Sequence, residues 1–322
     1  MPNDDASTQS NGKRFRAFKL VFQVLVLALV LVGIWRTVVK AVADLNQAGF
    51  ALAQIQFGWL LAAGVMYLLA LAPCWLFWHR TLHAMGQRPS RLESFRAFYI
   101  GHLGKYVPGK ALVVVLRAGL VRSPRVDTTA AAVSVFVETL TMMAVGAAVA
   151  AALLALLFRG QLSMLLLALA AVVGACVPTV PPIFRRLVRL AGARKFNPHI
   201  DRSLAGLDFR LMSFGWAANV TGWLLMGLSQ WLTLRAIPTM APVTWEQLPV
   251  VTACVALAMV AGFVLLLPGG LGAREWVLMT LLAPVFGPGV AMVAAIAQRL
   301  LSLLAEFVLA AVLYFLKPAQ SS

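Results

Sequence analysis

The chain has 322 residues, of which 61% are hydrophobic and only 12% are charged, and its mean hydropathy is +0.87. Soluble domains carry roughly 25% charged residues, so this composition excludes an ordinary soluble protein and predicts an all-α, polytopic integral membrane protein. The formal net charge of +16 does not indicate nucleic acid as a partner, because the basic residues lie between apolar segments and not in an arm with interleaved aromatic residues. The charge instead fits cytoplasmic loops that face anionic lipid headgroups.

Residues 1–17 form a polar tail that ends in a basic cluster and precedes an apolar run at 18–38. Such a tail lacks the apolar surface that would offset the entropy of ordering it, so we expect it to be disordered. The run at 18–38 has no cleavage signal, which predicts a retained first span. Basic residues beside a span stay in the cytoplasm, so we expect a cytoplasmic N-terminus.

Apolar runs long enough to cross a bilayer, about 17–25 residues each, mark the predicted spans. They occur at 18–38, 57–79, 129–157, 162–183, 207–235, 246–267 and 288–316. Two further segments, with candidate boundaries 97–120 and 268–287, are broken by glycine and proline or are too short to span. We therefore expect about seven or eight transmembrane helices, with two broken or re-entrant segments around a central polar cavity. Residues 18–316 would form one transmembrane domain and 317–322 a short tail.

Arginine and lysine are concentrated in two connections between the predicted spans. These are residues 80–125 and 185–202, whereas residues 39–56 contain a single lysine and residues 237–247 contain neither residue type. The positive-inside rule places the two basic connections on the cytoplasmic side of the membrane.

The two broken segments combine helix-breaking residues with basic side chains. The backbone breaks are Gly104, Pro108 and Gly109 in the first segment and Pro268, Gly269, Gly270 and Gly272 in the second. Non-helical backbone at membrane depth must be covered by protein or must line a wet cavity, and glycine lets backbone N–H groups converge on an anion. The residues predicted to hold a headgroup phosphate are Lys105, Lys110, Arg117 and Arg274.

The first segment admits two other interpretations. Its glycines would also allow close helix packing while its lysines extend to the cytoplasmic surface. Residues 104–110 match the first seven places of a phosphate-loop pattern, but Ala111 stands where a hydroxyl would bind Mg²⁺, and no β-strand pattern precedes it. A nucleotide site is therefore not expected.

Several ionisable residues lie inside apolar segments, where a charge needs a partner, a bundle interior or water. Glu138 lies within 129–157, and Arg299 and Glu306 are seven residues apart, which places them on one helix face. With Glu275, which follows the second break, they are predicted to line or gate the polar cavity. The alternatives are a structural ion pair and, for Glu275, a favourable charge at a helix N-terminus.

No motif indicates a cofactor, a metal or a catalytic centre. Cys74, Cys176 and Cys254 have no metal-binding spacing, and His79 and His83 share a helix face without a third ligand. No nucleophile motif is present. We therefore expect neither a catalytic residue nor enzymatic activity.

Three motifs resemble the flippase-like transmembrane family, the membrane region of the lysylphosphatidylglycerol synthase/flippase proteins. They are Gly104-Lys105-Tyr106-Val107-Pro108-Gly109 followed by Arg117, Pro268-Gly269-Gly270-Leu271-Gly272-Ala273-Arg274-Glu275, and the closing Arg299-Leu300-Leu301 with Glu306. The resemblance covers the chain from the first span to Leu316 and implies two re-entrant segments in a lipid-translocating or lipid-binding protein. Full-length synthases also carry a soluble aminoacyl-transfer domain, which these residues do not include, so synthase activity is not expected.

The leading hypothesis is a flippase of the bacterial or archaeal inner membrane that binds an anionic phospholipid or lipid-linked glycan. Without an ATP site, movement would be downhill or coupled to an ion gradient, with Glu138 or Glu306 as the proton carrier. The alternatives are a lipid-presenting subunit of a glycosyl- or aminoacyl-transferase and, with less support, a membrane-embedded lipid-modifying enzyme. Membrane lipids, a second copy of the chain and a membrane transferase are the expected partners.

Overall fold

The computed structural model describes residues 55–106, 111–157, 162–192, 197–237, 242–264 and 273–316, together with Val39 and Lys195. Over these residues the regular elements are helices, apart from one isolated bridge between Ser123 and Val126. The helices in chain order are α2 (Phe57–Ala84), α3 (Arg91–His102), η2 (Leu103–Tyr106), α4 (Ala111–Val121), α5 (Thr128–Leu157), α6 (Leu162–Cys176), η3 (Val177–Thr179), α7 (Pro181–Leu190), α8 (Ile200–Ala205), α9 (Phe209–Ala236), η5 (Trp245–Gln247), α10 (Leu248–Val264), α11 (Ala273–Phe286) and α12 (Pro288–Phe315). The predicted all-α class is confirmed.

Five helical stretches in the described residues are long and apolar enough to cross a membrane. They are Phe57–Ala84, Thr128–Leu156, Phe209–Ala236, Trp245–Val264 and Pro288–Phe315, and each coincides with a predicted span. At 1.5 Å per residue, even the shortest, with 20 residues, reaches about 30 Å, the thickness of the hydrocarbon core. The chain is therefore a multi-pass membrane protein. The predicted tail at 1–17 and the predicted first span at 18–38 lie outside the described residues.

The fourth predicted span, 162–183, is not one helix. Helix α6 ends at Cys176, the short η3 follows, and the separate helix α7 begins at Pro181. Proline lacks a backbone N–H and its ring clashes with the preceding turn, so Pro178, Pro181 and Pro182 stop one helix and start the next. The apolar run continues through a change of direction that its hydropathy alone does not reveal.

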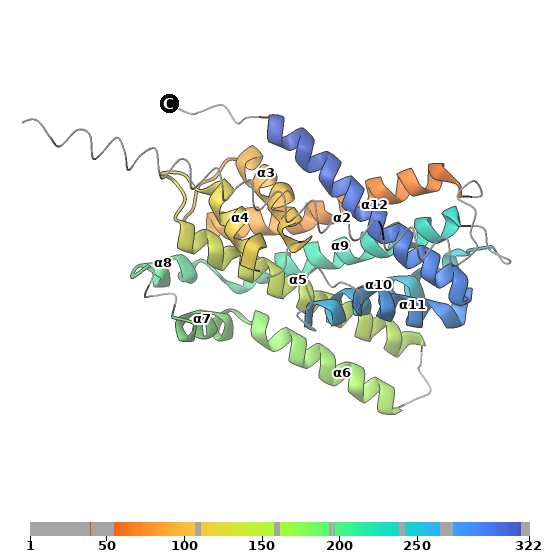
Figure 1. Ribbon diagram of the computed structural model, residues 1–322. Coiled ribbons are helices and arrows are strands. Elements are labelled where there is room, and N and C mark those ends of the chain that lie inside the picture. Colours follow the sequence, from red (N-terminus) through yellow and green to blue (C-terminus); the bar gives the residue numbers. More distant parts are fainter. Residues whose placement is uncertain are drawn as a thin grey trace, which may run out of the picture.

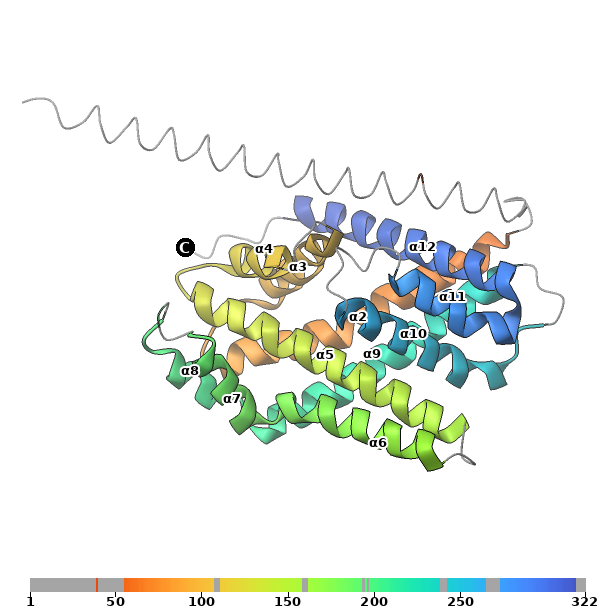
Figure 2. The same ribbon diagram turned by 60° about the horizontal axis from the view of Figure 1, so that its bottom comes forward.

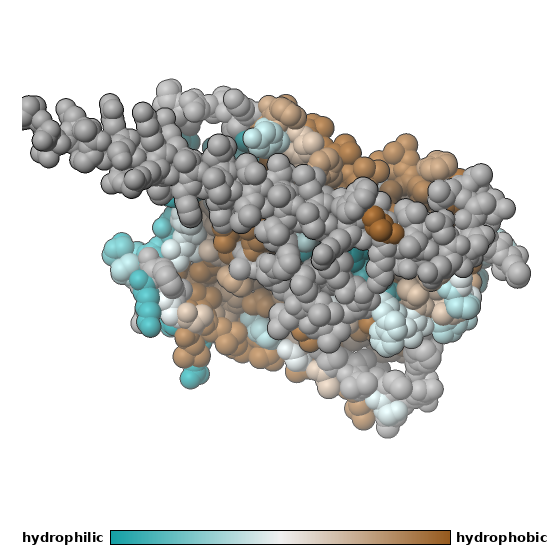
Figure 3. Space-filling view, viewed as in Figure 1, coloured by the Kyte–Doolittle hydropathy of each residue, from teal (hydrophilic) through white to brown (hydrophobic). Residues whose placement is uncertain are grey.

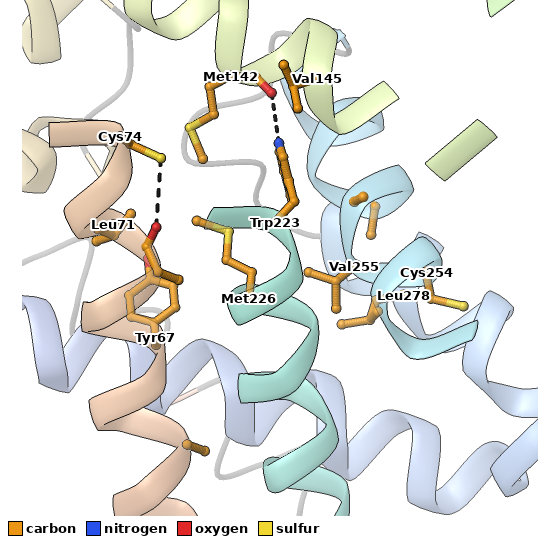
Figure 4. Close-up of a cluster of buried hydrophobic side chains, with 14 of the residues drawn as sticks. Tyr67, Leu71, Cys74, Met142, Val145, Trp223, Met226, Cys254, Val255 and Leu278 are labelled. Atoms are coloured by element: carbon orange, nitrogen blue, oxygen red, sulfur yellow. Dashed lines mark hydrogen bonds between the residues drawn. The ribbon is translucent and has the colours of Figure 1, made fainter. Parts of the chain in front are cut away.

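Helices α2 and α9 pack against each other along the middle of the bundle, with α5 and α10 beside α9 and α12 across α2 (Figures 1 and 2). In a membrane, small residues let helices approach closely. A Cβ atom at Gly146 of α5 would lie 2.5 Å from the Trp223 ring of α9, and the indole N–H of Trp223 donates to the Met142 carbonyl over 2.9 Å. Figure 4 shows this contact beside the buried side chains of α2 and α9. Close packing of large rings on glycine therefore holds the centre together.

Hydrogen bonds between side chains join α12 to α9. The Gln298 amide accepts from the Thr233 hydroxyl over 2.6 Å and donates to the Ser229 hydroxyl over 3.0 Å, and Ser229 donates to the Ala63 carbonyl of α2 over 2.8 Å. Near the C-terminal end of α12, Arg96 donates to the carbonyls of Leu313 and Tyr314 over 2.7 and 3.3 Å. Helix α12 is thus held near its middle and at its C-terminal end.

The two basic connections lie at the same end of the bundle. The Asn197 amide donates to the Asp127 carboxylate over 2.9 Å, and Gly206 packs against the Ala84 carbonyl. Helices α3, α4, α7 and α8 accordingly lie toward the left in Figures 1 and 2, and in Figure 3 hydrophilic residues gather on that side while many of the coloured residues farther right are apolar. This arrangement agrees with the prediction that both connections face the same compartment.

Candidate functional site

The first broken segment folds back on itself. Helix α3 starts with a capping box between Ser90 and Glu93, tightens at its end into η2, and packs against α4. A Cβ atom at Gly104 would lie 2.8 Å from the Val113 backbone nitrogen, and one at Gly101 would lie 2.5 Å from the Arg117 side chain. These glycines therefore permit close packing of the two arms, as one interpretation of the sequence predicts. The break residues Pro108 and Gly109 and the predicted ligand Lys110 lie outside the described residues.

Glu306 of α12 is the centre of a buried cluster. Its Oε1 atom accepts from Lys105 Nζ of η2 over 2.5 Å and from the Tyr67 hydroxyl of α2. His102 Nε2 lies 3.6 Å from the same oxygen, and the Tyr106 hydroxyl also interacts with the carboxylate. Burial lowers the pKa of the Lys105 ammonium, and Glu306 opposes that shift. The second carboxylate oxygen, Oε2, is buried and has no hydrogen-bond partner among the described residues.

Arg117 of α4 forms a second buried ion pair, with Glu138 of α5. Arg117 Nη1 donates to Glu138 Oε2 over 2.7 Å, and the two side chains are 3% and 2% exposed. The guanidinium also lies 4.0 Å from the centre of the Phe98 ring, within the range of a cation–π interaction. The charge of Arg117 is thus already paired, which agrees with the structural interpretation of the intramembrane charges.

His102 connects the two clusters. Arg117 Nη2 lies 3.2 Å from His102 Nδ1. Burial, together with the cations of Lys105 and Arg117, lowers the pKa of His102 well below its usual value, so the ring is neutral. Because a guanidinium can only donate, Nδ1 accepts and Nε2 carries the ring proton, which faces Glu306. The contacts therefore run from Glu138 through Arg117 and His102 to Glu306.

A third pair lies at the start of α11, after the second broken segment. Arg299, which lies two turns before Glu306 on α12, donates to Glu275. The neighbouring Arg274 acts electrostatically on Lys105, Tyr67 and Tyr106 and packs against Gly262 of α10. Within the described ranges, Arg274 has neither a hydrogen-bond partner nor an ion-pair partner. The break residues Pro268, Gly269, Gly270 and Gly272 lie outside those ranges.

Five of the predicted site residues therefore meet along one helix: Lys105, Arg274, Glu275, Arg299 and Glu306. Arg117 and Glu138 form their own pair and reach this group only through His102. Sequence reasoning missed Tyr67, His102 and Tyr106. His102 and Tyr106 stand in or beside the first glycine motif and could have been considered, whereas Tyr67 lies in an apolar run with nothing to distinguish it.

The described residues contain no group of three or more His, Cys, Asp or Glu residues able to hold a metal ion. His79 Nδ1 contacts the Ser94 hydroxyl over 2.9 Å, and His83 Nε2 contacts the Pro89 carbonyl over 3.1 Å. Cys74 and Cys254 are buried, and Cys176 is partly buried. These residues contribute to packing between and at the ends of helices.

The fold and the charged groups define a multi-pass α-helical membrane protein with interacting buried ion pairs beside two broken segments. The chain belongs to the family described as the lysylphosphatidylglycerol synthase TM region, whose model matches residues 21–310. The resemblance indicated by the three sequence motifs is therefore confirmed. No curated protein matches the chain.

Proposed function

We propose that this protein moves an anionic phospholipid or lipid-linked glycan across a bacterial or archaeal inner membrane, without a chemical step on the lipid. Family membership supports a role in lipid modification or flipping. The observation that favours flipping is the cation Arg274, which lies beside Lys105 without a partner of its own among the described residues. A partly buried cation in such a position is stabilised by an anionic ligand.

Lys105 and Arg274 come from different broken segments and would hold the headgroup phosphate between them. Lys105 is the more accessible member of its ion pair, with 26% of its side chain exposed compared with 1% for Glu306. Charge-assisted hydrogen bonds to phosphate are shorter and stronger than neutral ones. Lys110, if it lies near Lys105, would add a third cation.

The two broken segments would act as the re-entrant elements, with helices α3 and α4 on either side of the first break and α11 after the second. Helices α3 and α4 lie toward one end of the bundle and α11 toward the other (Figures 1 and 2). Both segments approach the same helix, because Lys105 contacts Glu306 and Glu275 contacts Arg299. A headgroup entering from one side would thus meet residues of both segments, as in transporters built around broken helices.

Leaflet exchange in liposomes tests the proposal. Liposomes containing the purified protein and a fluorescent phosphatidylglycerol are treated with dithionite, which quenches the outer leaflet only. The Arg274→Ala variant loses one charge-assisted contact, which contributes about 1.5–3 kcal/mol. Its rate of leaflet exchange should therefore be about tenfold to a hundredfold lower than that of the wild-type protein. Arg210→Ala is the matched control, because Arg210 is exposed at the start of α9.

The outcomes separate three cases. Exchange that requires Arg274 and not Arg210 supports the flippase. Equal exchange in both variants refutes the role of Arg274. Lipid binding without exchange in the wild-type protein refutes translocation and favours a subunit that presents lipid to a membrane transferase.

A further inference from the structure

The buried ion pairs differ in whether they can change partners. Arg117 is always charged and fully enclosed, and Glu138 accepts from it at 2.7 Å, so this pair is fixed. The Lys105–Glu306 pair joins a flexible, partly exposed ammonium to a carboxylate that is 1% exposed. Only Lys105 of this second pair can reach an incoming anion without moving a helix.

Glu306 would lose its main counter-charge if Lys105 turned to a phosphate. Its remaining contacts are the Tyr67 and Tyr106 hydroxyls and the neutral ring of His102, and its Oε2 has no hydrogen-bond partner among the described residues. Neutral donors compensate a buried carboxylate poorly, and a buried carboxylate without a cation becomes neutral by taking up a proton. An unpartnered oxygen is already in place to receive that proton.

We propose that Glu306 binds a proton when an anionic headgroup replaces it as the ion-pair partner of Lys105. The inference rests on the proposed function and adds its energy source. The step is balanced: the Lys105 ammonium exchanges the Glu306 carboxylate for the phosphate, and the carboxylate becomes a carboxylic acid by gaining one proton from water. A phosphodiester with one negative charge then moves together with one proton, so the transport is electroneutral and a proton gradient drives it.

Glu138 does not share this role, although the sequence allowed either carboxylate. Its counter-charge is a guanidinium that cannot give up a proton and that is held by Phe98 and His102 as well. The groups on or near Glu306 are different and come from several elements around it: Tyr67 of α2, Tyr99 and His102 of α3, Lys105 and Tyr106 of η2, Arg274 and Glu275 of α11, and Arg299 of α12 itself. Of the other cations in this set, Arg299 binds Glu275, and Arg274 acts on Lys105 and on the two tyrosines and is itself proposed to hold the phosphate. Lys105 is therefore the cation whose loss changes the charge of Glu306.

Proton uptake on lipid binding tests this directly. Short-chain phosphatidylglycerol is added to the detergent-solubilised protein in weak buffer with a pH indicator, and lipid binding is measured in parallel. The wild-type protein should take up as much as about one proton per bound lipid, and its affinity should rise up to about tenfold for each unit by which the pH falls. In Glu306→Gln, Lys105 has no ion pair to break before it contacts the phosphate. The variant should therefore bind the lipid at least as tightly as the wild-type protein does, independently of pH and without proton uptake.

Glu246→Gln serves as the matched control, because Glu246 is an exposed carboxylate on η5, away from α3 and η2. It should behave as the wild type. Lipid binding by the wild-type protein without proton uptake overturns the inference and leaves the proposed function intact. Uptake that persists in Glu306→Gln assigns the proton to another group and also overturns it. No lipid binding at any pH refutes the proposed function and this inference with it.

Discussion

Removing either member of the Arg117–Glu138 pair should destabilise the protein strongly. With Arg117→Met, the Glu138 carboxylate stays 2% exposed and keeps, among the side chains of the described residues, only the Thr139 hydroxyl as a hydrogen-bond donor, at 3.4 Å. Breaking a buried ion pair on one side costs about 3–5 kcal/mol, whereas replacing both partners by apolar residues is often close to neutral. We therefore expect a loss of about 3–5 kcal/mol for Arg117→Met and for Glu138→Leu, and a loss of less than about 2 kcal/mol for the double variant.

A partly exposed ion pair of similar length provides the control. Arg189 Nε donates to Asp201 Oδ1 over 2.9 Å, but these side chains are 48% and 34% exposed. Solvent-exposed pairs contribute about 0–1 kcal/mol, so Arg189→Met should have little effect. Reversible unfolding of the detergent-solubilised protein by sodium dodecyl sulfate measures all four variants. The reasoning is refuted if the double variant is as unstable as either single one, or if Arg189→Met costs as much as Arg117→Met.

The two remaining predictions concern packing. Gly101→Ala should destabilise the α3/α4 pair by about 1–3 kcal/mol, because the new Cβ would lie 2.5 Å from the Arg117 side chain. Gly119→Ala on α4, where a Cβ atom would have nothing within 4 Å, should be neutral or stabilising. Equal melting temperatures of the two variants would contradict this prediction. Gln298→Leu should cost only about 0.5–1.5 kcal/mol, because Ser229 and Thr233 each keep a backbone acceptor at 2.8 and 3.0 Å. A loss above about 3 kcal/mol in the same unfolding assay would show that this network behaves like a buried charge pair.

The long spans could be predicted because hydropathy and length decide them. Helix α9 is an example, because the predicted run 207–235 becomes Phe209–Ala236. Its start moves to the residue after Asp208, whose side chain accepts from the Leu211 backbone N–H and caps the helix. The run 162–183 was wrong because three prolines redirect the chain within sequence that stays apolar. Hydropathy reports the environment of a residue, whereas proline determines whether the backbone can continue.

The site could be predicted residue by residue but not pair by pair. Each intramembrane charge is visible in the sequence because of its cost, yet Lys105 and Glu306 are 201 residues apart and their pairing depends on the tertiary packing of η2 on α12. For the same reason, the sequence predicts Arg117 as a headgroup ligand without revealing that it pairs with Glu138. His102 acquires its role only from the two charged groups on either side of it.

The way α12 is held determines which element should move when a ligand arrives. Gln298 ties one half of α12 to α9, and Arg96 ties its last residues to α3, so Arg299 and Glu306 belong to a fixed frame. The element η2 has four residues and carries Lys105 between the end of α3 and the break. A change of partner at Glu306 should therefore act on η2 and not on α12. Shifting α12 would break several hydrogen bonds at once, whereas turning Lys105 breaks its two side-chain hydrogen bonds, to Glu306 and Tyr67, and its contacts with the Tyr67 and Tyr106 rings. In the proposed function, movement of η2 against a static last helix would be the least costly way to pass a charged headgroup.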